Sequence, residues 1–219
     1  MDINQEAKKF WGKEIKRANL LWPNEYAIRF VKRNFHDKSS VILDFGCGAG
    51  RNAIALAMEG YKMIAMDYSQ EAIDLARKKS LEQSLNIEFL VNKDNNLPLD
   101  SKSVNAIIAN GSLFYNNWND TMELVSNLYD VLLENGMMWS DWRAKEDSLY
   151  GMGEEVEKDF FKMNDESGRN GCYYHFFDEG QLRSIYEQAG FKNILVDKYM
   201  YTENNKKKKN VWWHVIAKK

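Results

Sequence analysis

The stretch VILDFGCGAGRNAIALA, residues 41–57, decides the fold class of this chain. Its short apolar run, from Val41 to Phe45, is bounded by serines and a glycine, which is typical of a strand buried on both faces of a sheet. A glycine loop follows, and then a helical pattern that ends at Gly60, a favoured C-terminal cap. We therefore predict a strand, a tight loop and a helix that packs on the sheet.

The same rhythm continues after this unit. Ser69 is expected to cap the second helix, because its hydroxyl can accept a hydrogen bond from the first turn. In order, the expected elements are a strand in 61–69 that ends at Asp67, a helix over 70–83, strands over 86–92 and 103–111, a helix over 119–136 and a strand over 137–143. Alternation of this kind favours right-handed parallel crossovers and a sheet with helices on both faces.

The remaining segments break the rhythm. We expect residues 3–35 to be helical, with Pro23 separating two helices. Residues 144–177 show no clear strand pattern, and 178–190 reads as a helix. Two final strands, over 191–202 and 210–219, are joined by a lysine-rich turn that favours an antiparallel pair.

Size and composition limit the possible classes. With 219 residues, 44% of them hydrophobic, the chain fits one domain over 1–219. The formal net charge of -2 gives no overall attraction to nucleic acid or anionic membranes. The two cysteines, Cys47 and Cys172, form neither a disulfide framework nor a metal motif, so we expect no metal.

The location is expected to be cytoplasmic. The first residues, MDINQEAKKFWGKEIK, lack the apolar core of a signal peptide. No apolar run approaches the roughly 20 residues that span a bilayer. We expect a small-molecule substrate, no nucleic-acid or membrane partner, and leave the oligomeric state open.

The glycine loop DFGCGAGR predicts a ligand site, because ligands of open α/β sheets bind beyond the carboxyl ends of the strands. Gly46, Gly48 and Gly50 allow a close approach of the backbone, and a helix N-terminus favours a carboxylate. A dinucleotide fingerprint would carry a third glycine where Arg51 stands. Asp67 suits the ribose of either a dinucleotide or an adenosyl cofactor, so it does not separate the two alternatives.

The ordered set of motifs resembles the class I S-adenosylmethionine-dependent methyltransferases. The similar stretches are 41–57, 63–69, NNLPLDSKSVNAIIANGSLFY at 95–115, VLLENGMMW at 131–139 and HFFDEGQLRSIYEQAGF at 175–191. The resemblance implies an α/β fold, namely a doubly wound, Rossmann-like, seven-stranded and mostly parallel sheet with an antiparallel last strand. It implies S-adenosyl-L-methionine as cofactor and S-adenosyl-L-homocysteine as product.

The resemblance also implies the cofactor site. The methionine part would lie among Asp44, Phe45, Gly46, Cys47, Gly48 and Gly50, the ribose at Asp67, the adenine at Tyr68, and the sulfonium beside Asn110 and Gly111. The family's adenine-contacting acid is absent, since Lys93 stands at its position, and Asp94 or Asn95 would take its role. We add Ser69, Trp11, Arg29 and Arg51, the two arginines as partners of the cofactor carboxylate.

Aromatic groups outside the glycine loop suggest where the methyl acceptor binds. We expect residues 1–36 to form a helical cover and 144–177 an inserted substrate cover. The predicted substrate-binding residues are Trp22, Tyr26, Trp142, Arg143 and Tyr174. Tyr115 and His175 are the candidate catalytic residues, with His175 as a general base.

The predicted function is methyl transfer to an oxygen or nitrogen nucleophile of a small molecule. Because the donor is already activated, the protein has mainly to align the nucleophile with the methyl group. A small amine, a phenol and a sugar hydroxyl all fit an aromatic cover. Two alternatives remain: a nicotinamide oxidoreductase, and a methyltransferase-like module that binds a partner without catalysis.

Overall fold

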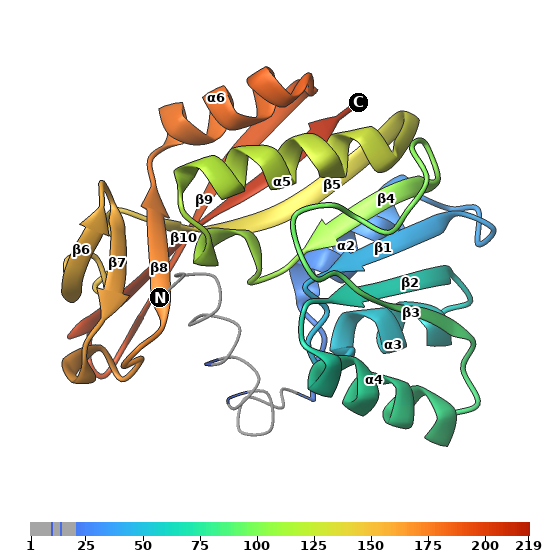
Figure 1. Ribbon diagram of the computed structural model, residues 1–219, viewed down its shortest axis with the longest axis horizontal. Coiled ribbons are helices and arrows are strands. Elements are labelled where there is room, and N and C mark those ends of the chain that lie inside the picture. Colours follow the sequence, from blue (N-terminus) through green and yellow to red (C-terminus); the bar gives the residue numbers. More distant parts are fainter. Residues whose placement is uncertain (1–9, 11–13, 15–20) are drawn as a thin grey trace.

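The computed structural model describes residues 10, 14 and 21–219 of the chain (Figure 1). Within this part, the central sheet has the strand order β3 (Ile87–Val91), β2 (Lys62–Asp67), β1 (Val41–Phe45), β4 (Val104–Ala109), β5 (Leu132–Ala144), β10 (Lys208–Lys218) and β9 (Lys192–Glu203). Strands β1 to β5 are parallel, whereas β10 is antiparallel to both β5 and β9. The predicted fold class and the antiparallel final pair are confirmed.

Helices cover both faces of this sheet (Figure 1). One face carries α2 (Glu25–Asn34), α3 (Arg51–Met58) and α4 (Gln70–Glu82), and the other carries α5 (Trp118–Val131) and α6 (Glu179–Ala189). In β1, Ile42 belongs to the apolar core under the first group, and Leu43 and Phe45 to the core under the second. This division follows from the alternation of side chains along a strand.

The helix starts follow from their capping residues. Asn24, next to Pro23, caps α2 by accepting hydrogen bonds from the backbone N–H groups of Tyr26 and Ala27. Ser69 caps α4 as expected, since its hydroxyl accepts a hydrogen bond from Ala72. An N-cap of this kind is worth about 1 kcal/mol of helix stability.

The boundary between α5 and β5 differs from the sequence prediction. The helical pattern predicts a helix as far as Gly136, but α5 ends at Val131 and β5 begins at Leu132. The helix ends early because the chain pairs with β4 at this point. The backbone N–H of Ser103 donates to the carbonyl of Val131, and Val104 pairs with Leu132. The expected stop residue, Asn135, instead takes a left-handed φ of 66° inside the irregular start of the strand.

The prediction that 144–177 carries no clear strand is wrong. The segment forms β6 (Gly153–Glu157), β7 (Phe160–Met163) and β8 (Tyr173–Phe177), together with the short turn η2 (Asp165–Ser167). Strand β8 pairs in parallel with the last two residues of β5, and β7 and β6 follow in antiparallel order. The end of β5 therefore pairs with β10 on one side and with β8 of the extension β6–β8 on the other (Figure 1).

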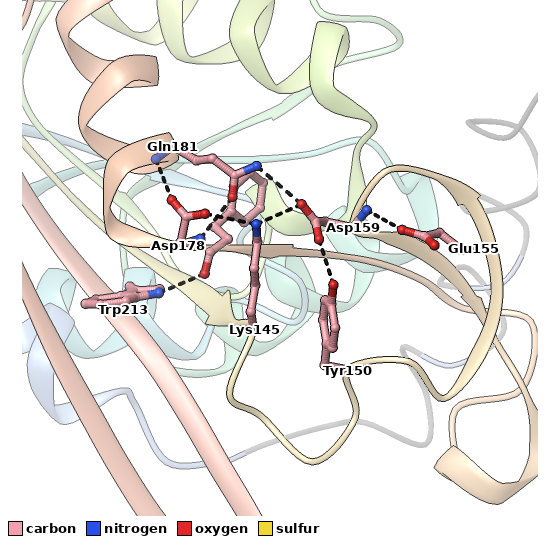
Figure 2. A network of polar contacts seen from close by, with 8 residues as sticks. Lys145, Tyr150, Glu155, Asp159, Asp178, Gln181 and Trp213 are labelled. Carbon is pink, nitrogen blue, oxygen red and sulfur yellow. Dashed lines mark hydrogen bonds and ion pairs between the residues drawn. The ribbon is translucent and has the colours of Figure 1, made fainter.

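A polar network ties this extension to the core (Figure 2). Lys145, just beyond β5, lies 2.8 Å from a carboxylate oxygen of Asp159 and 2.9 Å from one of Asp178. Asp159 also accepts a hydrogen bond of 2.8 Å from the Tyr150 hydroxyl, and Asp178 caps α6. Burial opposes ionisation of Asp159, but its hydrogen bonds from Lys145 and Tyr150 outweigh this and lower its pKa.

Replacing Lys145 with methionine is expected to lower the free energy of unfolding by about 1–3 kcal/mol, because Asp159 would stay buried without its cation. Chemical denaturation measures the change. The matched control is Lys102→Met, since Lys102 pairs with Glu134 at 2.9 Å on the open surface. That variant should change stability by no more than about 0.5 kcal/mol. Equal effects of the two substitutions would contradict a structural role for the network.

Candidate functional site

A cleft of about 1040 Å³ lies at the carboxyl ends of the parallel strands. Most of its lining follows β1, β2, β4 and β5 or belongs to the far strands β9 and β10. The predicted residues that line it are Phe45, Gly46, Cys47, Gly48, Arg51, Asp67, Tyr68, Ser69, Asp94, Asn95, Asn110, Gly111, Tyr115, Tyr26, Arg143 and Tyr174. The volume is at the upper end of the roughly 300–1,000 Å³ of ordinary ligand pockets, so a cofactor and a second molecule fit together.

The glycine loop forms the floor of the cleft. The backbone N–H groups of Gly46 and Cys47 both donate to the Met66 carbonyl, at 2.8 and 2.9 Å, which ties the loop to β2. Gly46 has a φ of 69°, and a Cβ built there would lie 2.3 Å from the Cβ of Ser112. Only glycine fits this position, because any side chain would collide with the segment that follows β4.

Asp67, at the end of β2, is joined directly to this loop. One of its carboxylate oxygens accepts a hydrogen bond of 2.8 Å from the Gly48 backbone, and the other accepts one of 2.9 Å from Ser69. Burial raises the pKa of Asp67, although these backbone donors oppose the shift. A carboxylate offers about four lone pairs, and with the backbone N–H of Tyr68 as a third donor to Asp67, about one acceptor position remains for a hydroxyl group of a ligand.

Asp44 supports the loop from behind instead of lining the cleft. One carboxylate oxygen accepts a hydrogen bond of 3.1 Å from Ala53 at the start of α3. The other oxygen is buried and has no hydrogen-bond partner among the described residues. Burial raises the pKa of Asp44 to about 7, against the smaller opposite effects of the Ala53 N–H and Arg51.

A network of side chains fixes Asn110 at the end of β4. Its amide nitrogen donates to Asp141 at 2.6 Å, and its oxygen accepts from Arg51 at 2.7 Å and from Asn52 at 3.3 Å. Asp141 also accepts a hydrogen bond of 2.6 Å from the backbone of Gly111. The amide of Asn110 is thus held in one orientation, and Arg51 lies on the cleft wall as predicted.

The residues predicted for the adenine lie just after β2 and β3. The ring of Tyr68 lines the cleft, and its hydroxyl is buried without a partner in the described part of the chain. Asp94 is exposed at the cleft rim, where it accepts a hydrogen bond of 2.9 Å from the backbone of Asn96. The amide of Asn95 donates to Glu123 at 2.7 Å and so faces α5.

On another part of the cleft lining, a group of aromatic rings surrounds Arg143. The rings of Tyr115 and Tyr174 have centroids 5.4 Å apart, and Phe114 lies 5.6 Å from Tyr174. Burial raises the pKa of the Tyr115 phenol well above its usual value and that of Tyr174 to about 12. Both phenols are therefore neutral near pH 7, and they act as hydrogen-bonding groups.

His175 does not lie where the sequence interpretation places it. The residue is 1% exposed, and it lies outside the cleft lining, stacked on Phe177 at a centroid distance of 4.3 Å. Its Nδ1 is 3.2 Å from the carbonyl of Asn116, and burial lowers its pKa to about 4. A general base must reach a proton of the acceptor, so the geometry removes His175 from that role.

Five other predicted site residues are not part of the described cleft. Gly50 is the N-cap of α3, behind the lining. Trp22 is 82% exposed, and only its carbonyl is used, as an acceptor for Arg51 at 3.1 Å. Arg29 pairs with Glu25 at 3.0 Å on the surface of α2. Trp142 is fully buried against Phe177 and α6, because neighbouring residues of β5 point to opposite faces. Trp11 lies outside the described residues.

The sequence interpretation missed the wall formed by β9 and β10. Asn210, Trp212 and His214 line the cleft, and their cross-strand neighbours Tyr201 and Tyr199 do so as well. The period of two in NVWWHV contained this signal, since it assigns Asn210, Trp212 and His214 to one face. It does not say which face meets the cleft, and that depends on the position of β10 beside β5.

Two further properties concern the described residues alone. None of the helices in 21–219 has both the length and the apolar character needed to cross a bilayer. Among the same described residues, no three His, Cys, Asp or Glu side chains come together as a metal-binding group.

Comparison with known proteins gives a family match. Residues 42–136 match the family model of a methyltransferase domain. A putative methyltransferase of Geobacillus sp. (strain WCH70) is 29% identical over 126 residues, which is 57% of this chain and 49% of that protein. A ubiquinone biosynthesis O-methyltransferase of Coxiella burnetii is 30% identical over 83 residues, 38% of this chain and 36% of that protein. The chain thus spans about half or less of these curated relatives.

Solved structures agree in fold. A SAM-dependent methyltransferase from Methanosarcina mazei has a TM-score of 0.72 at 21% identity, covering 86% of this chain and 96% of that one. The 1,6-didemethyltoxoflavin-N1-methyltransferase of Burkholderia thailandensis, solved with 1,6-didemethyltoxoflavin and S-adenosylhomocysteine, has a TM-score of 0.72 at 16% identity, with coverages of 99% and 88%. Together with the family match, this favours the methyltransferase alternative for the glycine loop.

Proposed function

We propose that the chain is a class I S-adenosylmethionine-dependent methyltransferase that methylates an oxygen or nitrogen nucleophile of a small molecule, and its methyltransferase domain match and its fold support this. The observation that carries the proposal is the joining of the glycine loop to Asp67, through the 2.8 Å hydrogen bond from Gly48. That pair forms the cradle that we propose for an adenosyl group.

The buried polar atoms of the site fit this cofactor. The acid of Asp67 suits a ligand with a positive charge, Asp44 adds a carboxyl group behind the loop, and the Tyr68 ring suits an adenine face. When bound, the sulfonium supplies an activated methyl group. The protein then has to exclude water and hold the acceptor in line, which the fixed Asn110 and the neutral phenol of Tyr115 are placed to do.

We assign the two covers different contributions. The part of 1–36 that lines the cleft is Asn24 and Tyr26, near the start of α2. The segment 144–177 contributes Leu149, Ser167, Arg169 and Tyr174. Tyr115 stays as the candidate catalytic residue, whose hydroxyl would orient the acceptor nucleophile.

The test is turnover. Purified protein is incubated with S-adenosylmethionine and a panel of small phenols, amines and acids, and release of S-adenosylhomocysteine is measured. We expect release with at least one acceptor, and calorimetry should detect S-adenosylhomocysteine but not NAD. Tight NAD binding without S-adenosylhomocysteine binding would contradict the proposal. Cofactor binding without turnover on an exhaustive panel would favour the non-catalytic module.

Cofactor binding is expected to strengthen as the pH rises from 5.5 to 7. Asp44 has a pKa of about 7, so it is mostly protonated at the lower pH, and a cationic ligand favours its ionised form. Binding therefore releases a proton, and the affinity should rise by up to about tenfold over this range. Calorimetry in buffers of different ionisation enthalpy measures the proton. Asp44→Asn should remove the pH dependence, and an unchanged dependence in that variant would exclude Asp44 as its source.

A further inference from the structure

The acceptor end of the cleft is built around one arginine. Arg143 pairs in register with Trp212 across β5 and β10, and its guanidinium lies 3.7 Å from the centroid of the Trp212 ring. Its Nη1 donates to Asp147 at 2.9 Å. The residue lines the cleft although it is only 6% exposed. The guanidinium is therefore held rigidly by an ion pair on one side and an aromatic face on the other.

Two hydrogen-bond donors at this end have no acceptor. They are Nε of Arg143 and Nδ2 of Asn210, both buried and both without a hydrogen-bond partner among the described residues. Asn210 is two positions from Trp212 on the same face of β10, and it also lines the cleft. A buried donor without a partner is destabilising, so an acceptor oxygen supplied by a ligand would relieve that cost.

The charges at this end favour an anion over a cation. Aromatic walls can bind a cation when a ring face is free, but the guanidinium of Arg143 already covers Trp212. Arg169, on the extension, lines the same end, and both arginines act to lower the pKa of Tyr174. Of the acids near this end, Asp147 pairs with Arg143 at 2.9 Å and Glu203 pairs with Lys208 at 3.3 Å. Asp141 accepts hydrogen bonds from Asn110 and Gly111, so Arg169 supplies the positive charge in excess at this end.

We propose that this end binds the carboxylate of a planar aromatic acid and that a ring hydroxyl of the acid is the methyl acceptor. Its oxygen would gain the methyl group and release its proton to solvent, and S-adenosylhomocysteine would be the leaving group. The carboxylate accepts hydrogen bonds from Arg143 and Asn210, and Arg169 adds a second positive charge. The ring of the acid packs among Phe114, Tyr115 and Tyr174. The assignment rests on the proposed function, since the cofactor occupies the other end of the same cleft.

The experiment uses the full chain saturated with S-adenosylhomocysteine. Three probes share one ring: 3,4-dihydroxybenzoate, its neutral methyl ester and 3,4-dihydroxybenzylamine. We expect the acid to bind at least tenfold more tightly than the ester, and the amine to bind least. Binding of the ester or amine as tightly as the acid, or no binding of the acid at millimolar concentration, would overturn the inference.

Variants locate the effect. Arg143→Gln should reduce acid affinity at least tenfold while leaving S-adenosylhomocysteine affinity unchanged. Arg169→Ala, on an exposed residue whose loss does not threaten folding, should reduce acid affinity about threefold to tenfold. The matched control is Lys207→Ala, which removes a positive charge from the exposed turn between β9 and β10 and should have no effect. The inference is wrong if Arg169→Ala binds the acid as tightly as the control variant does and Arg143→Gln still binds the acid more tightly than the ester. Failure of S-adenosylhomocysteine itself to bind would instead contradict the proposed function.

Discussion

Gly46→Ala is expected to abolish measurable cofactor binding and to lower the free energy of unfolding by about 4 kcal/mol or more. The new Cβ would lie 2.3 Å from the Cβ of Ser112, and the residue would keep a φ of 69°. The left-handed conformation alone costs about 1–2 kcal/mol, and relief of the collision would force the glycine loop away from the segment after β4. Thermal unfolding and calorimetry with S-adenosylhomocysteine measure the two effects.

Gly60 provides the matched control. It also has a positive φ, 92°, but a Cβ built there meets no atom within 4 Å. Gly60→Ala should therefore cost only about 1–2 kcal/mol and leave cofactor affinity unchanged. Adding Ser112→Gly to Gly46→Ala should recover part of the lost stability. If Gly46→Ala is no worse than Gly60→Ala, close contact between the loop and Ser112 is not what the position requires.

Asp67→Ala is expected to weaken S-adenosylhomocysteine binding about 100-fold, which corresponds to roughly 2.7 kcal/mol. The substitution removes the acceptors of the Gly48 and Ser69 backbone groups as well as the acceptor proposed for the ribose. Hydrogen bonds to a charged group contribute about 1.5–3 kcal/mol each, so the loss of one ligand contact and one loop contact accounts for the size of the effect.

Two companion variants make this result specific. Asp67→Asn keeps the shape and one acceptor oxygen, so we expect a loss of about tenfold. Asp74→Ala removes an exposed acid of α4 that accepts a hydrogen bond from Gln70, and it should leave the affinity unchanged. Affinity that survives in Asp67→Ala would refute the cradle described for the adenosyl group.

The centre of the fold was predictable because its signals are local. Val41 to Phe45 is an apolar run in a strand paired on both sides, and the adjoining loop and helix need glycine and capping residues at fixed positions. The position of Asp67 could be predicted in the same way, since a polar residue at the end of a buried strand is expected at the edge of the sheet where ligands bind. These features depend on the geometry of a few neighbouring residues, so they can be predicted from the local sequence.

The extension and the helix end at Val131 depend on distant pairing instead. Strand β8 is fully buried, and its run YYHFF contained a strand signal, but its partner β7 is reached only through a turn whose course the sequence does not specify. Likewise, the residues after Val131 have good helical propensity, yet pairing with Val104 draws them into the sheet. Tertiary contacts override local preference in both places.

The same distinction between local and distant contacts applies to the residues of the site. The loop residues and Tyr68 were found from motifs, whereas the β9 and β10 wall was missed and His175 was wrongly expected in the cleft. An alternating strand says which side chains share a face, and it does not say whether that face meets a cavity or a core. His175 lies on the core side of β8, while its neighbour Tyr174 lines the cleft.

The pairing of the end of β5 with β10 on one side and with the extension β6–β8 on the other gives the chain a modular architecture. The residues proposed for the cofactor lie in the Rossmann-like part, whereas Arg169 and Tyr174 belong to the extension, which joins that part through two residue pairs, the ion pairs of Lys145 and a shared apolar core. Exchange of the extension among homologous scaffolds would change acceptor preference and leave the methyl-donor machinery intact. Replacement of the extension at its junction with β5 is therefore a route by which acceptor preference can be changed.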